Sequence, residues 1–174
     1  MKKAILAAAA AGALTAAPAL ANDWTGFYAG INLGSVDVDT SVPGVGNDDT
    51  SYGVHVGYDY DLGNWVVGAE FEYDWTDVQL IPGAVSVDSV MRFKGKVGYD
   101  LGSTLLYFAA GSAEADVAGL GDDWGGFYGV GIAYQVSSQA SLSLEILEHD
   151  FNNIAGTGIN ADATSISARA SFRF

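Results

Sequence analysis

The chain ends in Ser165-Ile166-Ser167-Ala168-Arg169-Ala170-Ser171-Phe172-Arg173-Phe174, which alternates small polar or cationic side chains with apolar ones. An extended strand points successive side chains to opposite faces, so one face carries only Ile, Ala and Phe and the other only Ser and Arg. Two arginines in a soluble core would be strongly unfavourable. The pattern fits a strand whose apolar face meets lipid while its polar face lines a barrel.

The first residues of the sequence read as a secretory signal peptide. Lys2 and Lys3 precede an alanine-rich apolar run from residue 4 to 17, and Ala19 and Ala21 form an Ala-x-Ala cleavage site. We therefore expect residues 1–21 to be a signal peptide and residues 22–174 to form one barrel domain. No apolar stretch reaches the roughly 18 residues of a transmembrane helix, so strands must make any membrane crossing.

The composition favours a β protein. Glycine accounts for 23 of 174 residues, aromatic residues make up 12%, and turn signals recur along the chain. The absence of cysteine excludes a disulfide framework and a lipid-modified N-terminal cysteine.

Period-two alternation predicts eight strands. The second is the clearest, with Tyr52, Val54, Val56, Tyr58 and Tyr60 on one face. The fifth strand is apolar on both faces, so its facing stays open. Eight is an even number, as in single-chain bacterial barrels, and we expect an all-β, eight-stranded, antiparallel, up-and-down transmembrane β-barrel. The predicted strands span about 26–36, 51–60, 65–75, 89–99, 104–113, 124–136, 141–149 and 165–174.

The connections between these strands alternate in length. Tight turns are predicted at 61–64, 100–103 and 137–140, and longer loops at 37–50, 76–88, 114–123 and 150–162. In outer-membrane barrels the short turns are periplasmic and the long loops extracellular, which places both termini on the periplasmic side.

Every basic residue after the signal peptide falls on a predicted inward face. Acids on the third strand can pair with cations on the fourth across the hairpin, and Glu145 can meet Arg169 on the neighbouring strand. Because an eight-stranded barrel is only just wide enough for its own side chains, we expect a closed or barely conducting pore. This predicted interior charge ladder consists of Glu70, Glu72, Asp74, Arg92, Lys94, Lys96, Glu145, Arg169 and Arg173.

The predicted outer loops are acidic and contain no basic residue, which argues against nucleic acid as a partner. Solvated turn residues are the simpler interpretation, and Ca²⁺ or Mg²⁺ bridging to lipopolysaccharide phosphates is the alternative. The sequence lacks the alternating ligand order of a calcium loop, so no cofactor or metal is expected. The aspartates assigned to these loops are Asp37, Asp39, Asp48, Asp49, Asp77, Asp116, Asp122, Asp123, Asp150 and Asp162.

The two histidines, His55 and His149, are the candidates for a catalytic role. His55 lies mid-strand on an inward face, where it is expected to be a polar neighbour in the lumen, and His149 is expected at the rim. Ser141 and Ser143 fall toward the other end of the strand that carries His149, so no Ser/His pair can form there. We expect the protein not to be an enzyme, which excludes an outer-membrane lipid hydrolase.

A soluble lipocalin is the competing eight-stranded fold, because Asp23-Trp24-Thr25 is superficially similar to a lipocalin start. A lipocalin would point apolar residues inward and charges outward, whereas here rows of Arg, Lys and Glu alternate with aromatic belts. The sequence therefore favours the membrane barrel.

Taken together, these segments resemble the small Gram-negative outer-membrane barrels of the OmpA-like transmembrane and opacity-type porin family. The resemblance rests, in order, on Trp24-Thr25-Gly26-Phe27-Tyr28-Ala29-Gly30, the Gly129-Val130-Gly131 strand ending in Tyr134, the Glu145 strand ending in Asp150-Phe151, and Phe174. It implies that Phe172 and Phe174 are read by the barrel-assembly machinery. It also implies roles in envelope integrity, surface interaction or slow solute passage, and haem binding in some members.

We therefore expect a non-enzymatic protein of the outer membrane with a structural or surface-interaction role, in contact with membrane lipid and lipopolysaccharide. A narrow porin-like channel for small solutes or ions is the alternative, and the two differ in whether the charge rows leave a continuous water path. An extracellular ligand and the oligomeric state are left open by the sequence.

Overall fold

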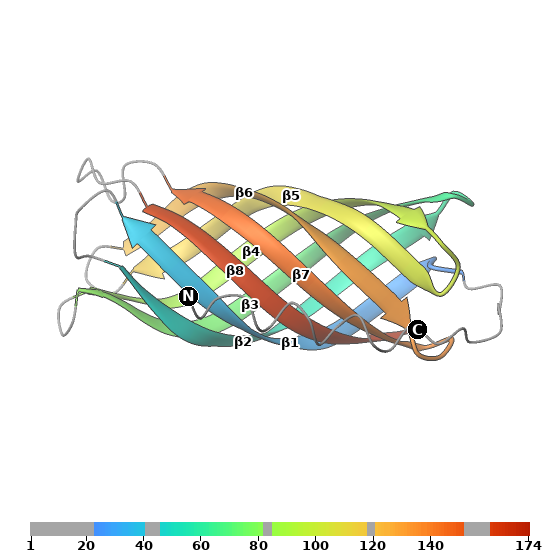
Figure 1. Ribbon diagram of the computed structural model, residues 1–174, viewed down its shortest axis with the longest axis horizontal. Coiled ribbons are helices and arrows are strands. Elements are labelled where there is room, and N and C mark those ends of the chain that lie inside the picture. The colour runs from blue at the N-terminus through green and yellow to red at the C-terminus, as the bar shows by residue number, and fades with distance from the viewer. Residues whose placement is uncertain (1–22, 41–45, 82–84, 118–120, 152–160) are drawn as a thin grey trace, which may run out of the picture.

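The computed structural model describes residues 23–40, 46–81, 85–117, 121–151 and 161–174. Eight antiparallel strands follow one another in chain order, and β8 pairs with β1 to close the barrel (Figure 1). The strands are β1 Gly26–Thr40, β2 Gly46–Asp61, β3 Trp65–Ile81, β4 Val85–Asp100, β5 Thr104–Val117, β6 Gly121–Gln135, β7 Ala140–Phe151 and β8 Ala161–Arg173.

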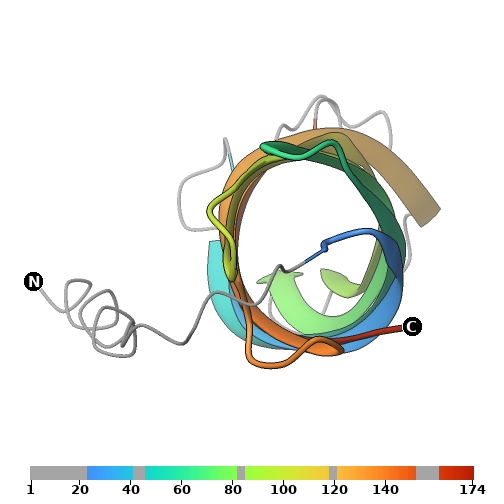
Figure 2. The same cartoon turned by 90° about the vertical axis from the view of Figure 1, so that its right-hand side faces the viewer.

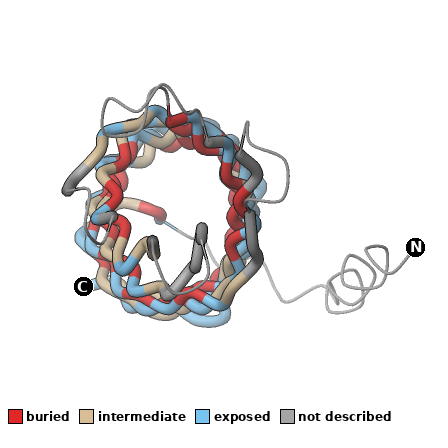
Figure 3. The backbone as a smooth tube through the Cα atoms, turned by 90° about the vertical axis from the view of Figure 1, so that its left-hand side faces the viewer, coloured by how far each residue is buried: buried red, intermediate tan, exposed pale blue. Residues whose placement is uncertain are grey.

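The predicted alternation of the strands is confirmed. In β2, Ser51, His55 and Asp59 are buried, whereas Tyr52 and Val56 between them are exposed. An end-on view shows the strands as a ring (Figure 2), and the buried and exposed residues alternate around it (Figure 3). The apolar side chains thus point away from the barrel axis and the polar ones toward it, the reverse of a lipocalin.

The structure settles the facing of the fifth strand. Leu105, Tyr107 and Ala109 are buried inside the barrel, whereas Leu106 and Phe108 are exposed on its outer wall. The strand is apolar on both faces because its inward residues pack in the lumen while its outward residues belong to the outer belt.

The strands are longer than predicted, and the loops correspondingly shorter. The described strands contain 12 to 17 residues, whereas a tilted strand needs only about 9–11 to cross the hydrocarbon layer. Only residues 41–45, 82–84, 118–120 and 152–160 lie between strands where long loops were expected. All ten aspartates assigned to loops fall within strand bounds, so that assignment was wrong. The three tight turns are at the predicted places.

The outer wall changes character along its length. On β7, Leu142, Leu144 and Ile146 are exposed apolar residues, and the next outward positions are the exposed acids Glu148 and Asp150. Pairing between the strands continues beyond the apolar belt, so the extra strand length projects past the hydrocarbon layer into water. Exposed acids are favourable there, which explains why they follow the apolar residues of β7.

Aromatic pairs lie at both limits of this belt. The rings of Trp65 and Tyr99 are 5.3 Å apart near the short turns, and those of Tyr52 and Trp75 are 5.7 Å apart toward the other end. Two such girdles are typical of a barrel that sits in a membrane. Among the described residues there is no helix of the length and hydrophobicity needed to span a bilayer.

Candidate functional site in the barrel interior

The centre of the lumen is occupied by ion pairs between β3 and β4. The register places Glu70 opposite Lys94 and Glu72 opposite Arg92. Arg92 Nη1 lies 2.8 Å from Glu72 Oε1, and Lys94 Nζ lies 3.1 Å from carboxylate oxygens of both Glu70 and Glu72. Asp74 also pairs with Arg92. These groups are buried, so each charge depends on its partners for the solvation that water would supply.

The same network crosses the lumen to the opposite wall. Arg169 on β8 lies 2.5 Å from Glu70 and 2.9 Å from Glu145 on β7. Lys94 lies 2.6 Å from Glu145, and the Tyr107 hydroxyl donates to the same carboxylate at 2.9 Å. Strands that are not neighbours in the sheet are thereby joined through the middle of the barrel.

A second group of charges lies nearer the short turns. Lys96 Nζ is 3.1 Å from Asp59 Oδ1, and Arg173 Nη2 is 3.0 Å from Asp59 Oδ2. The ladder predicted from sequence did not include Asp59, although its position on the inward face of β2 placed it beside these cations. Lys96 also donates to the hydroxyl of Tyr28 at 2.7 Å.

The ion-paired residues of the lumen are five cations and five acids, so their charges balance. Each of these ten residues forms at least one ion pair. A balanced and mutually paired set satisfies the condition under which ionised groups can be buried. The five cations are Arg92, Lys94, Lys96, Arg169 and Arg173, and the five acids are Asp59, Glu70, Glu72, Asp74 and Glu145.

His149 does not lie at the rim, contrary to the sequence prediction. It is 4% exposed, and its ring lies between those of Phe127 and Phe151, with centroids 5.4 and 6.3 Å away. Arg92 Nε donates to His149 Nε2 at 2.8 Å, and Nδ1 lies 3.2 Å from the Ala163 carbonyl. These contacts assign the neutral tautomer with the proton on Nδ1. The longer β7 carries His149 below the rim.

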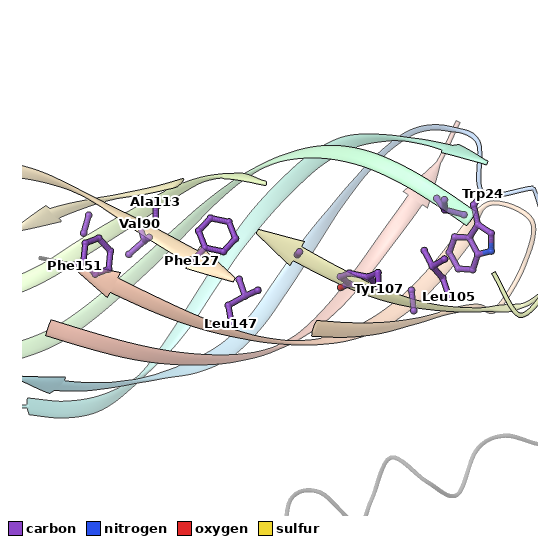
Figure 4. Packing of buried hydrophobic residues seen from close by; sticks show 12 residues of the cluster. Trp24, Val90, Leu105, Tyr107, Ala113, Phe127, Leu147 and Phe151 are labelled. Carbon is purple, nitrogen blue, oxygen red and sulfur yellow. The ribbon is translucent and has the colours of Figure 1, made fainter. Parts of the chain in front are cut away.

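Apolar residues pack inside the barrel on both sides of the charges (Figure 4). Phe127, Leu147 and Phe151 lie toward the end opposite the short turns, whereas Trp24 and Leu105 lie toward the short turns. The ionic centre is thus bounded by apolar side chains along the barrel axis.

One Ser/His contact escaped the sequence analysis. His55 Nε2 lies 2.8 Å from Ser171 Oγ, although β1 separates their strands in the sheet. The side chains meet across Gly30, where an added Cβ would lie 2.5 Å from His55 Nε2. The missing side chain at Gly30 is the feature of the sequence that could have indicated this contact. Among the described residues, none forms a hydrogen bond with the buried His55 Nδ1, and none therefore occupies the position of the third group of a catalytic triad.

Residues 23–25 lie against the short-turn end of the barrel. Gln135 Nε2 donates to the Asp23 carbonyl oxygen at 3.4 Å, and the Asp61 amide donates to the Thr25 hydroxyl at 3.1 Å. Hydrogen bonds from Thr25 hold the pKa of the Asp23 carboxyl below its usual range. These contacts tie the start of the described chain to two different strands, β6 and β2.

The remaining predicted site residues lie on the outer wall or outside the part of the chain that the structure describes. Phe172 and Phe174 are exposed on the outer wall, with ring centroids 5.4 Å apart. Ala19 and Ala21 lie outside the described residues. Over the part of the chain that the structure describes, no three His, Cys, Asp or Glu residues are grouped so that they could hold a metal ion.

The sequence matches the family described as "Outer membrane protein beta-barrel domain" over residues 6–174. It is 29% identical over 147 residues to a "22 kDa outer membrane protein" of Rhizobium leguminosarum bv. viciae, covering 76% of this chain and 67% of that protein.

Among solved structures, the fold is similar to that of Neisserial surface protein A (TM-score 0.55, 13% identity, covering 86% of this chain and 98% of that one). It is also similar to Ail, the attachment invasion locus protein of Yersinia pestis (TM-score 0.54, 13% identity, covering 86% and 99%). At these identities the similarity shows a shared fold.

Proposed function

Because the chain belongs to the outer-membrane β-barrel family, we propose that it is a non-enzymatic structural barrel whose lumen is closed to solutes and whose outer end is presented at the cell surface. Its role would be to support envelope integrity or to make surface contacts. The carrying observation is the buried ion network that joins β3 and β4 to β7 and β8 through the middle of the lumen.

The network supports a closed lumen because opening it would separate charges that stabilise one another. The single carboxylate of Glu145 contacts three side chains, those of Lys94, Arg169 and Tyr107. Removing one partner of a buried ion pair typically costs about 3–5 kcal/mol, so a path cut through this centre would be strongly disfavoured. The apolar residues on either side add to the closure.

The orientation and biogenesis that we propose follow the general rules for such barrels. Short turns and both termini would be periplasmic, and the acidic strand ends extracellular. Residues 1–21 would be removed as a signal peptide with Ala19 and Ala21 at the cleavage site. Phe172 and Phe174 would be read by the barrel-assembly machinery, in keeping with their exposure on the outer wall.

The proposed surface partners are set by charge. A structure similar to ours is that of Ail in complex with the heparin analogue sucrose octasulfate, a polyanion (TM-score 0.53, 14% identity, covering 86% of this chain and 99% of that one). In our chain the only basic residues after Lys3 are the five inside the lumen, while Glu148, Asp150 and Asp162 are exposed near the outer end. A cationic partner is therefore favoured over a polyanion, and contact with lipopolysaccharide phosphates would need bridging divalent cations.

The first test is conductance. The mature protein, reconstituted in a planar bilayer, is expected to give no single-channel steps between pH 5 and 8, with folded insertion checked by heat-dependent electrophoretic mobility. Discrete steps from folded barrels would overturn the closed-lumen proposal.

A narrow channel for small solutes or ions is the second candidate, supported by one feature. A polar cavity of about 30 Å³ lies in the lumen among Lys96, Ser143 and Arg169. A water molecule needs roughly 10–15 Å³, so the cavity can hold water beside the ionic centre. Single-channel steps from the wild-type protein that grow larger in Glu145→Ser would favour this channel.

A further inference from the structure

The short-turn mouth of the barrel holds a tryptophan that belongs to no strand. Trp24 precedes β1 and is 1% exposed, whereas Trp65, Trp75 and Trp124 are between 41% and 54% exposed on the outer wall. Figure 4 places Trp24 beyond Leu105 and Tyr107 toward the short turns, and Figure 2 shows the start of the described chain reaching from β1 into the opening of the ring.

The indole is bound by specific contacts as well as by packing. Its Nε1–H donates toward Asp100 Oδ1 at 3.3 Å and the Gly102 carbonyl oxygen at 3.1 Å. The Arg173 guanidinium lies 5.7 Å from the ring centroid and donates to the Trp24 carbonyl oxygen. The backbone amide of Trp24 donates to Asp61 Oδ2 at 3.3 Å. The side chain and the backbone of Trp24 thus both receive specific contacts, from residues of β2, β4 and β8 and from the turn at Gly102.

The backbone beside Trp24 is shaped for this insertion. Gly26 has φ +141°, a region that residues with a Cβ rarely adopt. An added Cβ there would also lie 3.2 Å from the Phe174 carbonyl oxygen. The glycine therefore lets the chain turn from the mouth into β1 while passing close to the end of β8.

We infer that the short-turn mouth is a binding site for an indole side chain, occupied by this chain's own Trp24, which seals the polar cavity of the lumen from water at that end. Trp24 lines this cavity together with Lys96 and Ser143. The inference deepens the proposed closed barrel and rests on it: the ion network closes the centre, and the tethered indole closes one end.

The inference can be tested by cysteine accessibility, because the chain has no native cysteine. Ser143→Cys places one thiol in the cavity wall with little change in volume. The rate of its modification by a negatively charged methanethiosulfonate is measured in folded full-length mature barrels. Three backgrounds are compared: native Trp24, Trp24→Ala, and Trp65→Ala, which removes an indole from the outer wall and serves as the matched control.

We expect slow modification in the native and Trp65→Ala backgrounds and at least a tenfold faster rate in Trp24→Ala. Free indole at millimolar concentration should return the Trp24→Ala rate toward the native one, because it can refill the vacated site. If Trp24→Ala does not fold, Trp24→Phe keeps a ring but loses the N–H donor, and a two- to fivefold acceleration is expected.

Equal rates in the native and Trp24-substituted backgrounds would overturn the indole site. So would an acceleration in Trp65→Ala as large as that in Trp24→Ala. Failure here is distinguishable from failure of the proposed function: a silent bilayer with equal labelling rates rejects only the indole site, whereas single-channel steps from the wild-type protein reject the closed lumen.

Discussion

The inner and outer faces of the same strands obey opposite rules. On β7, Glu145 is buried among Lys94, Arg169 and Tyr107, while Ile146, the next residue, is exposed on the outer wall. Inside, stability depends on specific partners at specific distances; outside, it depends on hydrophobic surface with few specific contacts. A lumen substitution should therefore be judged by the partners it removes, and a wall substitution by the solvent it meets.

The largest effect is expected inside. Glu145→Gln removes the negative charge shared by Lys94 and Arg169 with little change in shape, and should lower the free energy of unfolding by about 3–5 kcal/mol. The matched control is Glu148→Gln, the same change on the exposed face of the same strand, with an expected effect within about 0.5 kcal/mol. Urea unfolding in lipid vesicles, followed by tryptophan fluorescence, measures both. Equal losses of stability in the two variants would mean that the ion network does not make the inner face more sensitive to the loss of a charge than the outer face.

The second-largest effect is expected on the apolar outer wall of the barrel. Val130 is exposed in the middle of the apolar belt, between Phe108 and Ile146 in register. Val130→Arg should cost about 2–4 kcal/mol in vesicles, because a cation at mid-depth must leave water. Thr164→Arg, near the acidic end, should cost about 1 kcal/mol or less by the same measurement. A cost that does not depend on depth would argue against the membrane assignment of the belt.

A smaller effect is expected where the ionic centre meets the apolar end. His149→Phe removes the acceptor of the Arg92 Nε–H group and should cost about 1–3 kcal/mol through the unsatisfied donor. His149→Gln supplies another acceptor and should retain more stability. The midpoints of urea unfolding compare the two variants, and a Phe variant as stable as the Gln variant would show that packing between Phe127 and Phe151 matters more than the hydrogen bond.

The smallest effect is expected at the acidic rim. Asp150 and Asp162 face each other across β7 and β8, and like charges placed directly opposite destabilise a sheet. Asp162→Asn should raise the free energy of unfolding by roughly 0.2–1 kcal/mol at low salt. In about 1 M salt, where the Debye length is near 3 Å, the gain should vanish. A gain unaffected by salt would assign it to something other than repulsion.

Much of the fold could be predicted because lipid and lumen alternate along every strand. The facings of Arg92, Lys94, Glu70 and Glu72 follow from period two, and their pairing follows from the hairpin that joins β3 to β4. The fifth strand could not be assigned, because Leu105 and Leu106 are equally apolar. The predicted position of His149 at the rim was wrong, because the alternation of residues alone does not show how far a strand continues beyond the membrane.

The number of strands, the facing of most of them and the confinement of the cations to the lumen follow from the sequence alone, since each depends on neighbours in the chain or across one hairpin. Three features emerge only in the folded barrel: Lys94 reaches Glu145, Arg169 reaches Glu70, and Trp24 enters the mouth between Asp100 and Arg173. These contacts cross the lumen, and closing a sheet into a barrel brings together strands whose separation in sequence carries no information about distance.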